Sequence, residues 1–572
     1  MLLPYPQQVE LRAGTVHIGP PVCPDEGRLS KTGRIALDSL RRYLPREGGP
    51  VRFRLGSIEE GYEPAWLTPE QARFLARPQT SPEASVLRIA PDGVTVVGKG
   101  RWGMLYGAQT VNQLAIQARQ AGRGRLVCLE IRDWPDVKWR CLAPALTWYS
   151  GFNRLEGYDL NNWTRDEWKW LVDWSLLHKC NAWAVCMCGY WPFTLPGYPE
   201  SALDVQSDFF NPLTGKKERR RFVHRNIEHE FYPEVIRYAQ ERGVKMLAYT
   251  AINSFVGGYL LRHPEAGAGG AAELVPFHPG VDRYVDAFLG RMVEMGFDGF
   301  VWENPEANHV PNQNSQCYRT FWEPWARTYG YASVAQTQQN AAPLGVHVEY
   351  LTWLFNQYNG AVQRHAKRLG LPPRETHLVS HFLLARILDE SKSSDEARKW
   401  LDLVDRKQGT KVQWIVAESR EADYVKLLGG DRVASLGGRG GACTTAMRRI
   451  ASVNNNWEPA SMGTGIDWER GCHRRLLAAG GSGSIGYILE WRLSEIFAYL
   501  ASQYLWRSAG PPGINDMPTF GRLPVRPRLY WYPHKSDRVA SSTPTIAPVD
   551  VGQTRTPSAY EGDVPAQRRS GS

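Results

Sequence analysis

The sequence predicts an α/β protein in which a (β/α)8 TIM barrel follows a small N-terminal α/β domain. Three observations indicate this class. Eight apolar strand segments alternate with helical segments between about Trp139 and Trp506, and eight such repeats are typical of a TIM barrel. A different order, with two strands joined by a tight turn, precedes them. A proline-rich stretch without hydrophobic periodicity follows them, which is typical of extended chain. We therefore predict three domains, at 1–132, 133–510 and 511–572, the last a basic, disordered tail.

The N-terminal domain combines short strands with one long helix. Asp92-Gly93 between two apolar runs is a hairpin signal. The expected strands are Val51–Leu55, Val86–Ile89, Val94–Val97 and Leu126–Ile131, and the expected helix is Gly103–Gln120.

A G-x-G-x-x-G pattern at Gly98, Gly100 and Gly103 resembles a dinucleotide-binding fingerprint. The fingerprint needs an acidic residue about 20 positions later, and no acid occurs between Gly103 and Glu130. The preceding strand also follows a hairpin. We interpret the pattern as a tight strand-to-helix turn, and nucleotide binding is the weaker alternative.

The barrel elements follow from apolar runs, caps and terminal glycines. Thr164 and Glu167 have the spacing of a capping box, and glycines close several of the helices. The expected strands are Trp139–Leu146, Ala182–Cys188, Val244–Thr250, Gly299–Glu303, Thr376–His381, Val412–Glu418, Asp431–Leu436 and Ser484–Glu490. The expected helices are Thr164–His178, Phe231–Arg242, Val281–Met295, Val346–Leu369, Ser394–Lys407, Glu421–Leu428 and Leu493–Trp506.

Charge and composition exclude several classes of protein. The chain of 572 residues is 42% hydrophobic and 22% charged, which is ordinary for a globular protein. Its net charge of +10 is concentrated in Lys216–Arg225, with six cations and one acid, and in residues 507–572, with nine cations and five acids. A solvated loop and a basic tail therefore explain the charge, and we expect no nucleic-acid partner.

No apolar run approaches the roughly 18 residues of a membrane span, so no membrane partner is expected. Met1–Leu11 carries no signal-peptide pattern, which places the protein in the cytoplasm by default. Only Cys186 and Cys188 of the nine cysteines are near each other, which favours buried thiols over a zinc or disulfide framework. The histidines lack metal-site spacing, so no metal or other cofactor is expected, and a surface loop explains His224 and His229.

Candidate functional residues come from the strand ends, because TIM-barrel active sites lie at the carboxyl ends of the strands. Carboxylates end the fourth, sixth and eighth expected strands, and the catalytic candidates are Glu303, Glu418 and Glu490. The candidates for substrate binding, which are aromatic, amide or imidazole side chains at or next to strand ends, are Trp191, Tyr249, Asn253, Trp302, Asn304, His381 and Trp491.

Carboxylates and aromatic rings at a barrel mouth are suited to glycoside hydrolysis. One carboxyl protonates the leaving oxygen, and a second group stabilises or attacks the sugar centre. Trp302 beside Glu303 could raise the pKa of that acid by excluding water. The alternative is that some of these carboxylates pair with arginines as structural charges, most evenly balanced for Glu418 and Glu490. Ser-His-Asp catalysis is disfavoured, since no G-x-S-x-G turn follows a strand.

Several stretches, in their order along the chain, resemble the family 20 glycoside hydrolases, the β-N-acetylhexosaminidase group, and relatives that include α-glucuronidases. They are Pro4-Tyr5-Pro6-Gln7, the helix segment 103–110, Ile131-Arg132-Asp133-Trp134-Pro135 with Trp139-Arg140, Leu177-His178-Lys179-Cys180-Asn181, and Gly486 to Trp491 with Glu495 to Trp506. The resemblance covers about residues 1 to 510, and it implies a zincin-like N-terminal α/β domain before a catalytic barrel.

The resemblance also implies an activity, with departures. The family has an Asp-Glu pair after the fourth strand, where Asp orients the substrate acetamido group and Glu is the acid. Glu303 matches the Glu, whereas Trp302 occupies the Asp position. The arginine that usually follows the first strand is not evident after Cys141. We therefore expect a divergent glycoside hydrolase that acts on a carbohydrate substrate, with a non-catalytic carbohydrate-binding barrel as the alternative.

Overall fold

The computed structural model describes residues 4–62, 64–147, 159–187, 189–211, 213–252, 258–267, 274–275, 278–303, 323–328, 344–380, 383–409, 411–416, 421–437, 478–488, 502–503 and 505–507. All of them belong to the first of two units, Met1–Leu523, and the second unit is Pro524–Ser572. The expected tail and most of the expected last helix lie outside the described residues. In the part that is described, no helix has the length and apolar character needed to cross a bilayer.

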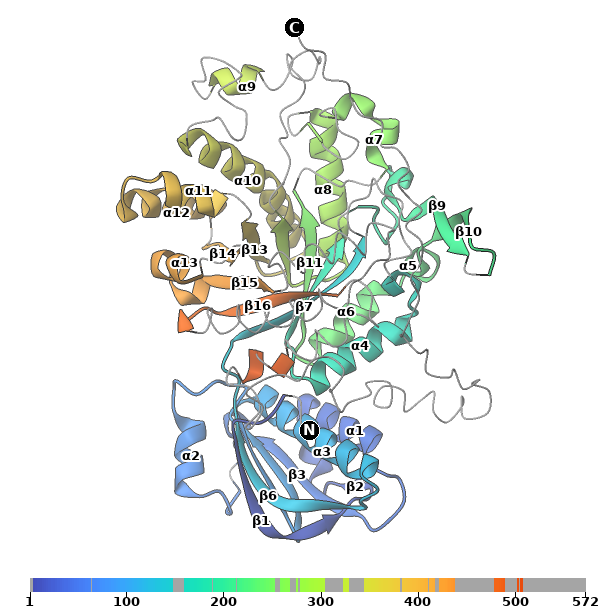
Figure 1. Ribbon diagram of the computed structural model, residues 1–572, viewed down its shortest axis with the longest axis vertical. Helices are drawn as coiled ribbons and strands as arrows, with labels where there is room; N and C mark the ends of the chain where they lie inside the picture. The colour runs from blue at the N-terminus through green and yellow to red at the C-terminus, as the bar shows by residue number, and fades with distance from the viewer. Residues whose placement is uncertain are drawn as a thin grey trace, which may run out of the picture. The chain divides into compact units, whose positions relative to one another are not determined.

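A six-stranded mixed sheet forms the N-terminal part of the chain (Figure 1). Its strands in sheet order are β1 (Gln8–His17), β6 (Arg125–Asp133), β4 (Ser85–Ala90), β5 (Gly93–Gly98), β3 (Val51–Ser57) and β2 (Pro21–Val22). The predicted hairpin is confirmed, because β4 and β5 pair antiparallel across the Asp92-Gly93 turn. The sequence reasoning missed β1 and β2.

Three helices cover this sheet: α1 (Lys31–Tyr43), α2 (Pro69–Ala76) and α3 (Arg101–Gln120). The first and third pack on one face, where Leu37, Phe53 and Val111 belong to one fully buried core. The second covers part of the other face, where Leu75 packs with Val86 in a smaller cluster. Both β4 and β5 are therefore buried on their two faces, which explains their continuous apolar sequence.

The glycine pattern between β5 and α3 is a tight turn, as predicted. A Cβ atom at Gly98 would lie 2.2 Å from the backbone nitrogen of Met104, and one at Gly103 would lie 2.1 Å from the carbonyl oxygen of Ala84. Neither distance is compatible with a side chain. The glycines are thus explained by close packing of the backbone against the neighbouring segment.

Eight parallel strands form the second sheet, and their pairings close into a barrel. In ring order they are β7 (Trp139–Thr147), β8 (Ala182–Met187), β11 (Lys245–Ala251), β12 (Gly299–Glu303), β13 (Glu375–Ser380), β14 (Gln413–Val416), β15 (Val433–Gly437) and β16 (Gly483–Ile488). The pairing of β16 with β7 completes the ring. The predicted α/β class is confirmed, and all eight expected barrel strands are present within a few residues of their expected bounds.

Helices follow the barrel strands in the chain. They are α4 (Arg165–Leu177), α6 (Tyr232–Gln240), α8 (Pro279–Glu294), α10 (Leu344–Arg368), α11 (Leu383–Glu390), α12 (Ser394–Gln408) and α13 (Glu421–Leu428). The predicted capping box at the start of α4 is confirmed, since the Thr164 side chain accepts from the Glu167 backbone and Glu167 caps Thr164 in return. Gly243 follows α6 with φ 75°, a left-handed conformation in which glycine carries no steric cost.

The connections at one end of the barrel carry extra elements: β9 (Asp204–Asn211), β10 (Lys216–Val223), α5 (Arg225–His229), α7 (Tyr259–Arg262) and α9 (Glu323–Thr328). The sequence reasoning predicted none of them. It expected a surface loop around His224, and that expectation is wrong. His224 is fully buried and its Nδ1 accepts from the backbone nitrogen of Asn226, which caps α5. Its burial lowers the pKa of His224 to about 3, so the ring is neutral near pH 7.

A buried ionic network joins the first sheet to the barrel. The Lys179 ammonium, 1% exposed, lies 2.5 Å from an Asp133 carboxylate oxygen and 4.3 Å from the centre of the Trp506 ring. The other Asp133 oxygen accepts from the Trp506 indole at 2.8 Å and from the Gln7 backbone at 3.0 Å. Nearby, the buried Arg140 donates to the Lys179 carbonyl. The segments that carry the family resemblance therefore meet at this junction.

Lys179 holds an unusual backbone conformation for this purpose. Its φ is 61°, in the left-handed region just after the end of α4, where glycine is the usual residue. A lysine there costs of the order of 1 kcal/mol in backbone strain. Lys179 at this position is the ionic partner of the buried Asp133 carboxylate.

Candidate active site

The barrel interior is packed mostly with small and aliphatic side chains, which come from seven of its strands. Val301 of β12 belongs to this interior cluster together with Cys186, Tyr249, Val379 and other inward-facing residues. Side chains alternate between the two faces of a strand. Glu303, two residues after Val301, therefore faces the same interior side, at the carboxyl end of β12.

Glu303 is the one carboxylate among the last described residues of the eight strands. It is 4% exposed, and its carbonyl oxygen accepts from the Ile252 backbone at 3.1 Å. In the strand register it lies beside Ala251 of β11 and Val379 of β13. Neither of these two register neighbours carries a charge.

Tyr249 lies one layer deeper in the barrel than Glu303. Its register partners are Val301 and Cys186, and its side chain is fully buried in the interior cluster. The structure thus places this predicted binding residue inside the barrel, as part of its packed core.

Trp302 requires a correction. Its ring stacks on Phe300 at 5.1 Å between ring centres and meets Tyr358 of α10 edge-on at 5.8 Å. It is 1% exposed and lies on the opposite face of β12 from Val301 and Glu303. The ring therefore packs between strand and helix. It neither lines a cleft nor shields the Glu303 carboxyl from water.

Trp191 requires the same correction. Its indole nitrogen donates to the Tyr284 hydroxyl at 2.8 Å, and its ring stacks on Phe288 at 4.6 Å between centres. Both partners belong to α8, and the Trp191 side chain is 1% exposed. It is an anchor of the β8 connection on the outer helix and not a platform for a sugar.

Six of the ten predicted site residues lie outside the described residues. They are Asn253, Asn304, His381, Glu418, Glu490 and Trp491. Glu418 follows β14 in the chain, and β14 is two ring positions from β12. Glu490 follows β16, which is four ring positions from β12. The predicted roles of these residues stay predictions.

The strand-end reasoning missed a buried carboxylate on the barrel rim. Glu200 follows β8 in the loop before β9, and its side chain is 8% exposed. Among the described residues, neither carboxylate oxygen has a hydrogen-bond partner. Its ion-pair partner is Arg262 at 3.4 Å. Tyr259 and Tyr284 stack beside it at 4.2 Å between ring centres. Burial raises the pKa of Tyr259 to about 12, so its hydroxyl stays neutral. Glu200 does not follow a strand directly, so no sequence signal marked it.

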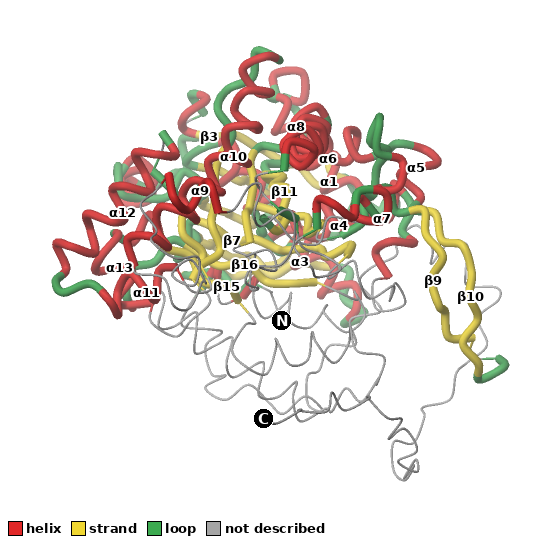
Figure 2. The backbone as a smooth tube through the Cα atoms, turned by 90° about the horizontal axis from the view of Figure 1, so that it is seen from above, coloured by secondary structure: helices red, strands yellow, loops and turns green. Residues whose placement is uncertain are grey.

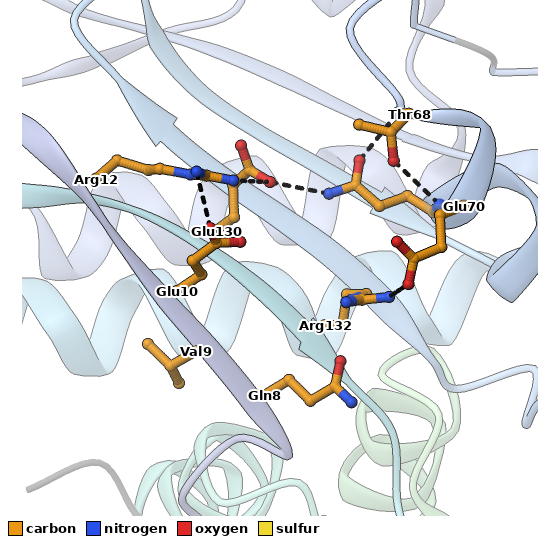
Figure 3. A pocket seen from close by; sticks show the side chains of 9 residues that line it. Gln8, Val9, Glu10, Arg12, Thr68, Glu70, Glu130 and Arg132 are labelled. Atoms are coloured by element: carbon orange, nitrogen blue, oxygen red, sulfur yellow. Dashed lines mark hydrogen bonds and ion pairs between the residues drawn. The ribbon is translucent and has the colours of Figure 1, made fainter.

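A separate pocket of about 350 Å³ opens on the N-terminal sheet, between β1, β6 and the start of α2 (Figure 3). Arg12 bridges two carboxylates there, at 2.8 Å from Glu10 and 3.5 Å from Glu130. Arg132 pairs with Glu70 at 2.6 Å. The two arginines of this pocket are thus paired with its three carboxylates, and no aromatic ring lines it. Elsewhere too, the described residues contain no group of three potential metal ligands.

Comparison with known families identifies the first part of the chain. Residues 1–134 match the model of glycosyl hydrolase family 20, domain 2. These residues include the whole six-stranded sheet, from β1 to the end of β6. No curated protein matches the sequence.

Solved structures resemble most of the chain at low sequence identity. A family 20 exo-β-N-acetylglucosaminidase from Vibrio harveyi, in complex with N-acetylglucosamine, aligns with a TM-score of 0.53 and 12% identity over 91% of this chain and 74% of that one. An inactive mutant of the Vibrio harveyi enzyme gives 0.50 and 11% over 88% and 73%. At this identity the likeness concerns the fold. Together with the matched domain, it confirms the resemblance seen in the sequence: the chain is family 20-like, and divergent.

Proposed function

We propose that this family 20-like chain is a glycoside hydrolase of the β-N-acetylhexosaminidase-like type, with Glu303 as its general acid and base. The observation that carries the proposal is the place of Glu303, nearly buried and inward-facing at the carboxyl end of β12. Support also comes from a fold shared with family 20 enzymes. In this proposal the ring of strands is a TIM barrel that spans 133–510, after a zincin-like domain at 1–132 and before the tail at 511–572.

The proposed chemistry begins with proton transfer. Glu303, in its neutral form, donates its proton to the glycosidic oxygen as the bond to the sugar breaks. In an inverting reaction the second carboxylate takes the proton of the attacking water, whereas in a retaining reaction the Glu303 carboxylate takes it in the second step. An apolar setting favours the neutral form of a carboxyl group. In this proposal the uncharged register neighbours of Glu303, Ala251 and Val379, contribute to such a setting, and Trp302 does not.

A second group must assist at the sugar centre. The Asp of the family pair is replaced by Trp302, whose ring packs against α10, so position 302 offers no carboxylate to orient an acetamido group. We propose Glu418 or Glu490 for this role. Their strands are two and four ring positions from β12, which favours a wide separation of carboxyls. A separation of about 6.5–9.5 Å would give inversion through a water, whereas about 5 Å would give retention.

The remaining candidates would bind the sugar itself. Asn253 and Asn304 offer amides for hydroxyl groups, His381 an imidazole, and Trp491 a ring for an apolar sugar face. The second candidate function is a carbohydrate-binding barrel without activity. The observation that favours it is the absence of an acid at position 302 beside Glu303.

A panel of chromogenic aryl glycosides, with N-acetylhexosaminides first, tests the proposal. Glu303→Gln should lower turnover about 10²- to 10⁴-fold, which is the usual contribution of a general acid, and should leave the melting temperature nearly unchanged. The matched control is Glu375→Gln, because Glu375 begins β13 at the opposite end of the barrel. The Glu375→Gln variant should turn over substrate at the wild-type rate. Full activity of the Glu303 variant would refute the assignment. Sugar binding without cleavage of any glycoside would establish the binding barrel instead.

A further inference from the structure

The connection after β8 carries a two-stranded antiparallel ribbon, which we call the arm: β9 and β10, residues 204–223. Its register runs without a break from Lys216 opposite Asn211 to Val223 opposite Asp204. Seen from above, the arm extends away from the helices around the barrel (Figure 2). Among the described strands, β9 and β10 pair only with each other. The sequence had indicated a solvated loop here, and the structure shows an ordered ribbon instead.

The base of the arm is fixed to the barrel rim. The Leu203 backbone donates to the Trp191 carbonyl at 2.7 Å, and the His224 backbone donates to the Leu203 carbonyl at 2.9 Å. Asn226, which is buried, donates to the Pro192 carbonyl at 2.6 Å and accepts from the backbone of the segment that enters α6. Because Trp191 is itself anchored on α8, the arm projects from a rigid base. An isolated two-stranded ribbon is only marginally stable in water, so a surface partner would be expected to stabilise it.

The arm is basic toward its outer end. Residues 204–223 contain five Lys or Arg and three Asp or Glu, a net charge of 5 − 3 = +2. Arg221 pairs with Asp204 at 2.5 Å, at the base, and Arg220 pairs with Glu218. Within the described residues, the exposed side chains of Lys216 and Arg219 take part in no hydrogen bond or ion pair. These two cations are therefore available to a ligand.

The arm and Glu303 belong to the same end of the barrel. The arm lies in the connection that leaves the carboxyl end of β8 and leads to α6, and Glu303 is at the carboxyl end of β12. Parallel strands of one barrel place all their carboxyl ends on one side. A long polymer bound at Glu303 could therefore extend over the arm.

We propose that the arm binds negatively charged glycans, and that the substrate class of this barrel is a polymer bearing carboxylate or sulfate groups. The inference rests on the proposed glycoside hydrolase function. The exposed cations of the arm are complementary to negative groups on a polymer that lies along it. A protein that binds DNA through about 6–10 phosphate contacts needs a similar number of cations, and residues 204–223 contain five Lys or Arg. The glycan is thus the partner that both the charge and the location favour.

Direct binding tests the proposal with the full chain. Polygalacturonate and chondroitin sulfate serve as carboxylate and sulfate probes, dextran as the neutral polymer, and duplex DNA as the competing class. Lys216→Glu/Arg219→Glu should weaken binding of at least one acidic polymer about fivefold or more. Binding by the wild type should also weaken from 50 to 300 mM salt, because exposed charges are screened. The matched control is Arg46→Glu/Arg123→Glu, the same charge change at two exposed arginines of the N-terminal part.

The outcomes separate this inference from the proposed function. Equal weakening by both double variants, equal binding of dextran, or binding of DNA alone would overturn the inference. Cleavage of a small neutral aryl glycoside measures catalysis without a contribution from the arm. The variant Lys216→Glu/Arg219→Glu should therefore cleave it at the wild-type rate. If the chain cleaves a glycoside but no polymer binds through the arm, the inference is wrong and the proposed function stands. Arm-dependent binding of an acidic polymer without cleavage of any glycoside would support the arm as the binding surface and defeat catalysis.

Discussion

Removing the Asp133 carboxylate should strongly destabilise the folded chain, because Asp133 lies in the ionic network that joins the first sheet to the barrel. The variant Asp133→Ala leaves the Lys179 ammonium, 1% exposed, without its ionic partner. It also removes the acceptor for the Trp506 indole and for the Gln7 backbone. Burial lowers the pKa of Lys179, and the Asp133 carboxylate opposes that shift. Breaking a buried pair from one side typically costs about 3–5 kcal/mol.

The melting temperature converts this cost into a measurement. The entropy of unfolding is about 2.1 cal/mol/K per residue, so a unit of roughly 500 residues has an unfolding entropy of about 1 kcal/mol/K. A loss of about 3–5 kcal/mol then lowers the melting temperature by about 3–5 °C. Scanning calorimetry, supported by urea unfolding, measures the shift.

A double-mutant cycle separates the ion pair from general damage. In Asp133→Ala/Lys179→Met both charges are absent, so the double variant should be more stable than Asp133→Ala alone. The control is Glu241→Ala, which breaks a 2.7 Å pair with Lys31 in which both side chains are about a third or more exposed. This change should cost at most about 1 kcal/mol. A shift under about 1 °C for Asp133→Ala, or strict additivity in the cycle, would refute the reasoning.

Two further predictions concern the packing of the barrel rim. Trp191→Ala should cost about 3–5 kcal/mol of unfolding free energy, since it empties a buried site and removes the indole that donates to the Tyr284 hydroxyl. Unchanged stability in urea unfolding would indicate that the ring lines a cleft instead. The pKa of His224 is about 3 in the folded chain and near 6.5 unfolded. The unfolded state therefore binds more protons below pH 6.5, and stability should fall by about 1.4 kcal/mol per pH unit from about pH 6 toward 4. His224→Asn retains a side-chain acceptor for the α5 cap and should remove that part of the slope in urea unfolding at several pH values; an unaltered slope would contradict the assignment.

The sequence could predict the elements whose determinants are local. Strand β12 and its neighbours were found because buried parallel strands are nearly continuous apolar runs. The start of α4 was found because the capping box of Thr164 and Glu167 depends on residues three apart. By contrast, β1 was missed because it is an edge strand exposed along most of its length, so it shows no apolar alternation. The sequence also predicted the end of the barrel at which chemistry should occur, because connectivity alone decides it.

Only the tertiary structure decided which way the side chains face. Alternation along β12 puts Val301 and Glu303 on one side and Trp302 on the other, but it does not say which side is the interior. The helices outside the barrel decide it, because Tyr358 of α10 packs on the Trp302 ring. In the same way Trp191 faces α8 rather than a cleft. The sequence of this protein thus determined its strands, their order and its family resemblance, whereas inside and outside were decided by contacts between residues distant in the chain, which local patterns do not encode.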